Sequence, residues 1–279
     1  MATPTRHNQL LALLYHPMKI RALAFCLLSL LTLPAFAQTT VASWSMGDDD
    51  TGAANGNAVN ATLTASVGSN LDVVGSGLTY TSNTAPGSTG DFAVSFTGLG
   101  YYNVASNLGL TTNFAMETWV NFPSVNSSPQ WVIRVGNGGS NGAGVLLSDS
   151  KLKAINSGDL IYGIANDAAP NTWYHVALVV DQAGQAQMYL NGGLVTGATF
   201  NANSFASNFG FGADENGNAP LQGILDDAKV FTFATGTFTT AMLNGGTPVP
   251  EPSTWAAFAG LTALSFVFFR RRRSSSNKL

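Results

Sequence analysis

The fold of this chain is decided by the stretch NTWYHVALVVDQAGQAQMYLNG, residues 171–192. Residues 173–180 are apolar on both faces, which is typical of a strand inside a sheet that is covered on both sides. A turn at 181–184 leads into a second strand at 185–190. Asn191-Gly192 supplies positive φ at the tip of a further hairpin. The stretch therefore predicts consecutive antiparallel strands within an all-β domain.

The rest of the chain between residues 38 and 246 continues this pattern. It is rich in Gly, Asn, Ser and Thr and poor in Lys, Arg and Glu, a composition that suits strands joined by turns. Only residues 237–243 predict a short helix. Further strand candidates are 41–45, 92–96, 101–104, 114–122, 131–135, 145–148, 152–155, 160–164, 209–212 and 224–231. Since no long repeat is visible, these strands predict an antiparallel two-sheet jelly-roll sandwich.

The N-terminal residues 1–37 predict a secretory signal peptide. Two basic residues next to Met18 are followed by a short apolar segment. Ala35 and Ala37 form the small-x-small pattern that signal peptidase accepts, so we expect translation from Met18 and cleavage before Gln38. The alternative is an uncleaved membrane anchor, for which the apolar run is short.

The other end of the chain, residues 247–279, predicts a membrane segment. Residues 255–269 carry no charge. We expect a transmembrane helix over 254–269, about 22 Å long for its uncharged part, against a hydrocarbon core of about 30 Å. The basic residues that follow can extend to the lipid headgroups and favour the cytoplasmic side, which leaves the domain outside the inner membrane. They are Arg270, Arg271, Arg272 and Arg273.

Pro250, Glu251 and Pro252 precede this helix, and the order of these parts resembles the PEP-CTERM sorting signal of Gram-negative bacteria. The resemblance implies that an exosortase recognises the segment and removes the helix near the Pro-Glu-Pro motif. The protein is then expected at the cell surface or in the extracellular matrix. Such proteins are usually linked to exopolysaccharide and biofilm production. The alternative is a plain C-terminal membrane anchor.

The domain between these ends, residues 38–246, resembles the laminin-G-like, concanavalin A-like jelly roll. The segments that carry the resemblance, in order, are 41–45, 92–101, 114–120, 171–177, 189–192 and 223–231. Among them, 173–177 matches the W-x-H-V-A strand and 223–231 matches the closing strand. This fold hosts lectins, glucanases, adhesion modules and spacers, so the resemblance does not name an activity.

Charge and cysteine usage narrow the function classes. Residues 38–246 contain four bases and fourteen acids, a net charge of −10. Four scattered cations cannot neutralise a run of phosphates, so nucleic acid is not an expected partner. The only cysteine, Cys26, lies in the predicted signal peptide. The mature domain therefore has no disulfide, no zinc–thiolate site and no cysteine nucleophile.

The residues predict no catalytic site. Glucanases of this fold carry an E-x-D-x-x-E strand, but Glu117 has no carboxylate at positions 119 or 122, and the only other glutamate of the domain is Glu215. His175, the only histidine of the domain, lies in the 173–180 strand, where we expect a structural role. No strand-to-helix nucleophile elbow of the G-x-S-x-G type is predicted. A hydrolase or lyase stays as an alternative that needs clustered carboxylates.

The resemblance also suggests a structural calcium site. Related jelly rolls bind calcium through an Asp of the last strand and early-loop carbonyls, and Asp226 falls at that position. Asp48, Asp49 and Asp50 crowd one early loop and are further candidates. The alternative is that these carboxylates form hydrogen bonds or face solvent.

A carbohydrate site would need exposed aromatic rings beside amides or carboxylates. The candidates are Tyr101, Tyr102, Trp131 and Tyr162, near Asn103, Asn137, Asn141 and Asn166, with Trp119 as a further aromatic. Core packing is the alternative for each. We expect an exported, non-enzymatic module that binds or organises exopolysaccharide. A spacer without a ligand is the second hypothesis.

Overall fold

The computed structural model describes residues 38–104, 108–137, 141–156, 159–163, 167–201 and 208–244. The predicted signal peptide with Ala35 and Ala37, and the predicted sorting segment 247–279, lie outside the described residues. Within the described part of the chain, no helix is long and apolar enough to cross a membrane. The first strand begins at Gln38, the residue after the predicted cleavage site.

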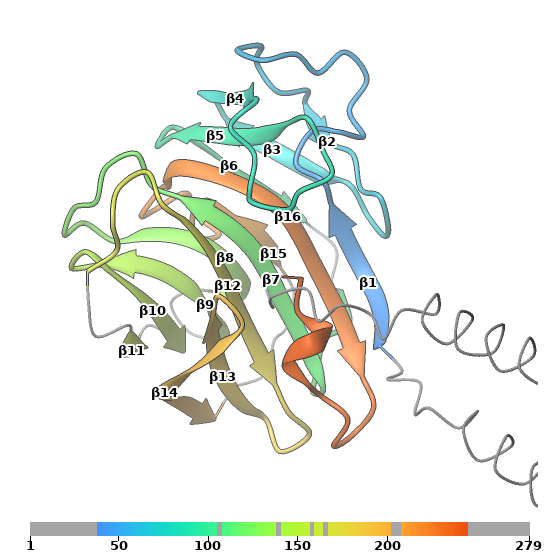
Figure 1. Ribbon diagram of the computed structural model, residues 1–279, viewed down its shortest axis with the longest axis vertical. Helices are drawn as coiled ribbons and strands as arrows, with labels where there is room; N and C mark the ends of the chain where they lie inside the picture. The colour runs from blue at the N-terminus through green and yellow to red at the C-terminus, as the bar shows by residue number, and fades with distance from the viewer. Residues whose placement is uncertain are drawn as a thin grey trace, which may run out of the picture. The chain divides into compact units, whose positions relative to one another are not determined.

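Two antiparallel eight-stranded sheets form a sandwich, which confirms the predicted jelly-roll fold (Figure 1). Sheet A runs in the order β14 (Gly193–Asn201), β13 (Gln185–Leu190), β12 (Trp173–Val180), β7 (Phe114–Asn121), β16 (Gln222–Phe233), β5 (Ala93–Thr97) and β4 (Leu78–Thr81), and β1 (Gln38–Trp44) also pairs with β16. Sheet B runs in the order β11 (Asp159–Gly163), β10 (Lys151–Asn156), β9 (Asn141–Ser148), β8 (Gln130–Asn137), β15 (Phe209–Phe211), β6 (Gly100–Val104), β3 (Leu71–Gly75) and β2 (Thr62–Leu63).

The core lies between the two sheets. Alternate residues of each strand point inward, as the two-residue period of a strand requires; in β7 these include Phe114, Met116 and Val120. Trp44 packs between the two sheets, stacked on Phe209 at a centroid distance of 5.3 Å. Because the inner faces of both sheets are covered, side chains that point outward from sheets A and B are the ones available for a function.

The stretch that predicted the fold lies in the middle of sheet A. β12 pairs with β7 on one side and with β13 on the other. At the first turn, Asp181 Oδ1 accepts hydrogen bonds from the backbone N–H groups of Ala183 and Gln185. At the second turn, Asn191 and Gly192 have φ of 49° and 78°. Both turns of the predicted hairpins are therefore confirmed.

The last described segment, Ala234–Asn244, is named the C-terminal strap here because it crosses the outer face of sheet A. Its Met242 and Leu243 are buried, and Phe238 packs beside them. Together they form a small second core, whose sheet residues are Ala115, Ala177, Val179, Tyr189, Phe231 and Phe233. The helix predicted over 237–243 is reduced to a single 3-10 turn at Thr240–Met242, since three of the seven residues are threonines, which are poor helix formers.

Candidate functional site

The outer face of sheet A carries two tryptophans on neighbouring strands. In the register of β7 and β12, Trp173 lies opposite Asn121 and His175 lies opposite Trp119. Trp119 and Trp173 are therefore diagonal neighbours on the face that points away from the core. Both side chains stay partly exposed, whereas Trp44 is only 1% exposed. We name Trp119 and Trp173 the tryptophan pair.

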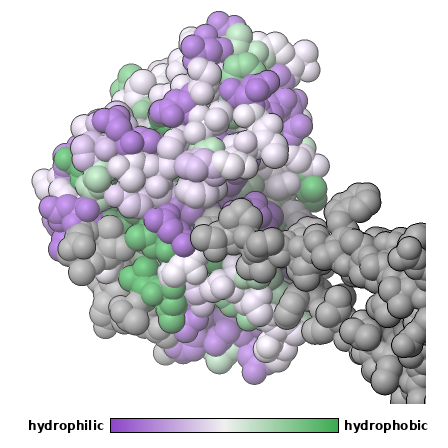
Figure 2. Space-filling model, in the orientation of Figure 1, coloured by the Kyte–Doolittle hydropathy of each residue, from purple (hydrophilic) through white to green (hydrophobic). Residues whose placement is uncertain are grey.

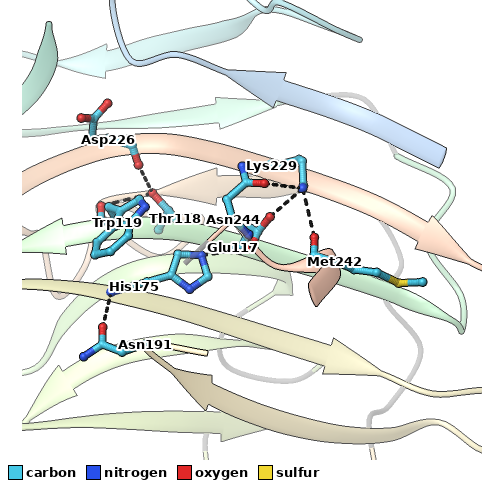
Figure 3. Close-up of polar contacts among 9 residues, drawn as sticks. All are labelled: Glu117, Thr118, Trp119, His175, Asn191, Asp226, Lys229, Met242 and Asn244. Carbon is cyan, nitrogen blue, oxygen red and sulfur yellow. Dashed lines mark hydrogen bonds and ion pairs between the residues drawn. The ribbon is translucent and has the colours of Figure 1, made fainter. Parts of the chain in front are cut away.

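A buried polar cluster lies beside this pair (Figure 3). Glu117 comes from β7, His175 from β12 and Lys229 from β16, so three adjacent strands contribute. The Glu117 carboxylate is 3.0 Å from His175 Nε2 and 2.9 Å from Lys229 Nζ. The His175 ring packs edge-on against Trp119 at a centroid distance of 5.2 Å. The cluster therefore packs against the side of one member of the tryptophan pair.

The C-terminal strap closes the cluster from outside. Asn244 donates its backbone N–H to Glu117 Oε2 at 2.9 Å. Lys229 Nζ donates to the Met242 carbonyl at 3.3 Å and to Asn244 Oδ1 at 2.8 Å. The Glu117 side chain is fully buried. Its oxygens are held by protein groups, so no substrate reaches this carboxylate while the strap is in place.

Asp226 and Asp48, two of the predicted calcium ligands, lie near enough for their charges to interact. Asp226 lies on β16, and its carboxylate accepts the backbone N–H groups of Ala85 at 2.7 Å and Asp227 at 2.8 Å. Burial raises the pKa of Asp226 to about 7, and the neighbouring charges of Asp227 and Asp48 contribute. Asp48 accepts the backbone N–H groups of Asp91 and Phe92. Burial also raises the pKa values of Asp48 and Asp227.

Asp50, another predicted calcium ligand, forms hydrogen bonds, the alternative that the sequence left open. Its carboxylate accepts the Tyr80 hydroxyl at 2.7 Å and the Thr64 backbone N–H at 2.8 Å. Both of its oxygens thus tie β4 to the chain that follows β2. Burial, with the Asp50 contact, raises the pKa of Tyr80 to about 12. Asp49 accepts the hydroxyls of Ser45 and Ser66.

The fit of calcium to the Asp226 region depends on its oxygen donors. Asp48, Asp226 and Asp227 supply hard carboxylate oxygens, and a divalent cation would offset their mutual repulsion. Among the described residues, however, no group of three or more His, Cys, Asp or Glu side chains is arranged to hold a metal. A calcium ion here would therefore need backbone carbonyls in addition to these side chains.

The aromatic residues that the sequence singled out on sheet B do not form an exposed platform. Tyr102 points inward and is fully buried, and Trp131 is 5% exposed beneath Ala219. Tyr101 stays partly exposed. The side chains of Tyr162, Asn137 and Asn141, and the whole of Asn166, lie outside the described residues.

Arg134 explains why this part of sheet B is closed. It is fully buried and donates to the Ala213 carbonyl at 2.9 Å, the Gly136 carbonyl at 3.2 Å and Asn103 Oδ1 at 3.1 Å. Burial lowers its pKa. The guanidinium therefore holds the loop after β15 against the outer face of sheet B.

Trp173 was missed as a candidate because its strand is apolar on both faces. The pairing register between β7 and β12 is the signal that would have identified Trp173. The alternation of residues 114–122 places Glu117, Trp119 and Asn121 on one face, and the antiparallel pairing of β12 places Trp173 and His175 on that same face.

Two family models match the chain. One, described as the concanavalin A-like lectin/glucanases superfamily, matches residues 96–237. The other, described as the PEP-CTERM protein-sorting motif, matches residues 248–273, which confirms the predicted sorting signal. No curated protein matches the chain.

Several solved structures are similar to the domain. A mutant of Trypanosoma rangeli sialidase displaying trans-sialidase activity has a TM-score of 0.51 at 13% identity, over 74% of this chain and 33% of the sialidase. T. rangeli sialidase in complex with sialic acid has a TM-score of 0.50 at 13% identity, over the same shares. Domain 4 of AbnA, a GH43 extracellular arabinanase from Geobacillus stearothermophilus, in complex with arabinotriose, has a TM-score of 0.49 at 16% identity, over 74% of this chain and 98% of that domain. The chain spans about a third of the length of the sialidases, and at such identities the likeness shows the fold alone.

Proposed function

The chain belongs to the concanavalin A-like lectin/glucanases superfamily, and on that premise we propose that it is a non-enzymatic module that binds or organises extracellular polysaccharide. Its PEP-CTERM motif marks it as an exported protein on a cell-envelope route in a Gram-negative bacterium, with processing by an exosortase. Signal peptidase is the partner expected at the other end. The membrane is a partner through the C-terminal segment until that segment is removed.

The tryptophan pair is the observation that carries this proposal. Sugars stack on aromatic faces and donate hydroxyl hydrogen bonds to nearby polar groups. Trp119 and Trp173 are the partly exposed tryptophans of the described residues, and they lie together on one sheet face. The face of the domain in Figure 2 is mostly hydrophilic or neutral, with hydrophobic residues in a small region. Such a surface suits a hydrated ligand such as a polysaccharide.

The state of Glu117 supports the non-enzymatic part of the proposal. Glycoside hydrolysis by a pair of carboxylates requires that both reach the sugar. Glu117, the carboxylate nearest to Trp119 along β7, is buried and engaged by Lys229, His175 and Asn244. The domain's other glutamate, Glu215, belongs to the loop after β15, which covers sheet B. The two glutamates therefore do not face a common substrate.

Calcium at Asp226 belongs to the same proposal as a structural element. Asp226, with Asp48 and Asp227, would hold the ion and keep the loop before β5 in place. The ion would supply only positive charge there. Cation binding that stabilises the wild-type protein, and fails to stabilise an Asp226→Asn variant, is the expected result.

The test of polysaccharide binding uses the full-length chain in detergent. Polysaccharide pull-down and glycan arrays are compared for the wild type, Trp119→Ala, Trp173→Ala and the double variant. The double variant is expected to lose at least about tenfold in retention, because both stacking surfaces are removed. Tyr101→Ala on sheet B is the matched control and should bind like the wild type. Retention of no polysaccharide by the wild type would favour a spacer, and equal loss in the control would remove the tryptophan pair from the proposal.

A further inference from the structure

The C-terminal strap is the segment through which the sandwich connects to its sorting motif. The strap ends at Asn244, and the matched sorting motif starts at residue 248. Six residue steps separate Asn244 from Pro250. A fully extended chain of that length spans at most about 22 Å. The position of the strap therefore determines how far Pro250 can extend from the folded domain.

Two kinds of contact hold the strap on sheet A. The first is apolar: Met242 and Leu243 are buried in the second core, and Phe238 packs on Phe233 at a centroid distance of 5.2 Å. The second is polar, and it joins the strap backbone and the Asn244 side chain to side chains of the sheet. Asn244 donates to Glu117, and Lys229 donates to Met242 and Asn244 (Figure 3).

Two of the polar contacts are made to the backbone of the strap, and the third is made to the Asn244 side chain. Glu117 accepts a backbone N–H, and Lys229 binds the backbone carbonyl two residues earlier. The two charges also neutralise each other at 2.9 Å, in a site that the strap shields from water. Removing the strap would expose the apolar side chains of the second core to solvent and break the hydrogen bonds to Glu117 and Lys229, which disfavours release.

The first strand and the C-terminal strap begin at the same end of the sandwich. Gln38 pairs with Phe233, the residue before the strap begins. Figure 1 shows the start of β1 and the strap at the same end of the sandwich. The strap therefore starts beside the first residue of β1 and runs from there to Glu117 and Lys229 on the outer face of sheet A.

We propose that the strap is a clasp, locked by Glu117 and Lys229, that sets the reach of the sorting tail. With the clasp closed, Pro250 stays within about 22 Å of the fold. With the strap released from Ala234, sixteen residue steps would extend to at most about 58 Å. Release would therefore more than double the distance at which the exosortase can reach its motif.

Hydrogen exchange of the full-length chain in detergent tests the clasp itself. Asn244→Ala removes the side-chain acceptor of Lys229 at an exposed position, so the sandwich is expected to fold. Lys229→Met removes the contacts of the ammonium with Glu117, Met242, Asn244 and the Phe231 ring. Exchange in residues 238–244 should rise about tenfold or more in each variant, as expected for losing a hydrogen bond to a charged group, while β7 stays protected. Lys153→Met, which breaks an ion pair with Asp149 on sheet B, is the matched control.

Two results would overturn the clasp. One is a strap that exchanges equally fast in the wild type and in Asn244→Ala. The other is a strap whose protection is lost only together with that of β7. If Lys229→Met prevents folding, hydrogen exchange of the strap in Asn244→Ala tests the clasp without it. This readout does not depend on polysaccharide binding, so the clasp and the proposed function can fail separately.

Processing in cells that contain an exosortase tests whether the strap limits how far the sorting tail extends. This part rests on the sorting assignment. The processed fraction at a fixed time should be larger for Asn244→Ala than for the wild type and Lys153→Met. Equal processing of all three, in spite of faster exchange in the strap, would mean that the clasp does not set the reach.

Discussion

Replacing Asp226 by Asn tests the electrostatics of the last strand most directly. The Asp226 side chain is buried, and its pKa is raised from 3.8 to about 7 by burial and by the charges of Asp227 and Asp48. In the folded protein this carboxyl therefore binds its proton more tightly than in the unfolded chain. Its stabilising effect is complete below pH 3.8 and is lost as the pH rises through about 7.

The size of the pKa shift of Asp226 determines how much the stability of the folded protein changes with pH. Three pKa units correspond to about 4 kcal/mol at 1.36 kcal/mol per unit. Relaxation of the surroundings and the accepted hydrogen bonds reduce this, so we expect wild-type stability to fall by about 2–4 kcal/mol between pH 4 and pH 8 without divalent ions. Asp226→Asn removes the charge and can still accept the Ala85 N–H, so its stability should vary much less with pH.

Urea denaturation at pH 5 and pH 8 in EDTA measures this difference. The variant should be more stable than the wild type at pH 8, by about 2 kcal/mol. Added calcium should raise the stability of the wild type only, because the cation binds the ionised Asp226 carboxylate of the folded protein, and the variant lacks this carboxylate. Asp149→Asn, at an exposed carboxylate on sheet B, is the control and should leave the pH dependence unchanged. The reasoning is refuted if wild type and Asp226→Asn have the same pH profile in EDTA.

Two further changes test the carboxylate and guanidinium contacts that hold the loops. Gly90→Ala would place a Cβ against the Asp48 carboxylate, and should cost about 1–3 kcal/mol of unfolding free energy in urea melts; a neutral result would mean that Asp48 can move freely. Arg134→Lys should cost about 2–3 kcal/mol, because a lysine cannot replace the three guanidinium nitrogens that donate to Ala213, Gly136 and Asn103. An unchanged urea midpoint for Arg134→Lys would show that these bonds do not hold the loop.

Patterns confined to one strand or turn predicted the fold well. The alternation in 114–122, the doubly apolar strand at 173–180 and the Asn191-Gly192 turn all depend on neighbours a few residues apart. Side-chain direction in a strand and positive φ at a turn are local properties. For the same reason, the order of Pro250, an apolar run and Arg270 was sufficient to identify the sorting motif.

Only the tertiary structure decided which outward-facing residues meet. Glu117 receives the N–H of Asn244, 127 positions away, and Asp226 receives that of Ala85, 141 positions away. The position of Trp119 and Trp173 on one face likewise depends on the pairing of β7 with β12. The sequence alone determined an exported, strand-rich domain with a sorting tail, because those signals are local. The residues that share a surface followed from the register between distant strands, which no short-range pattern encodes.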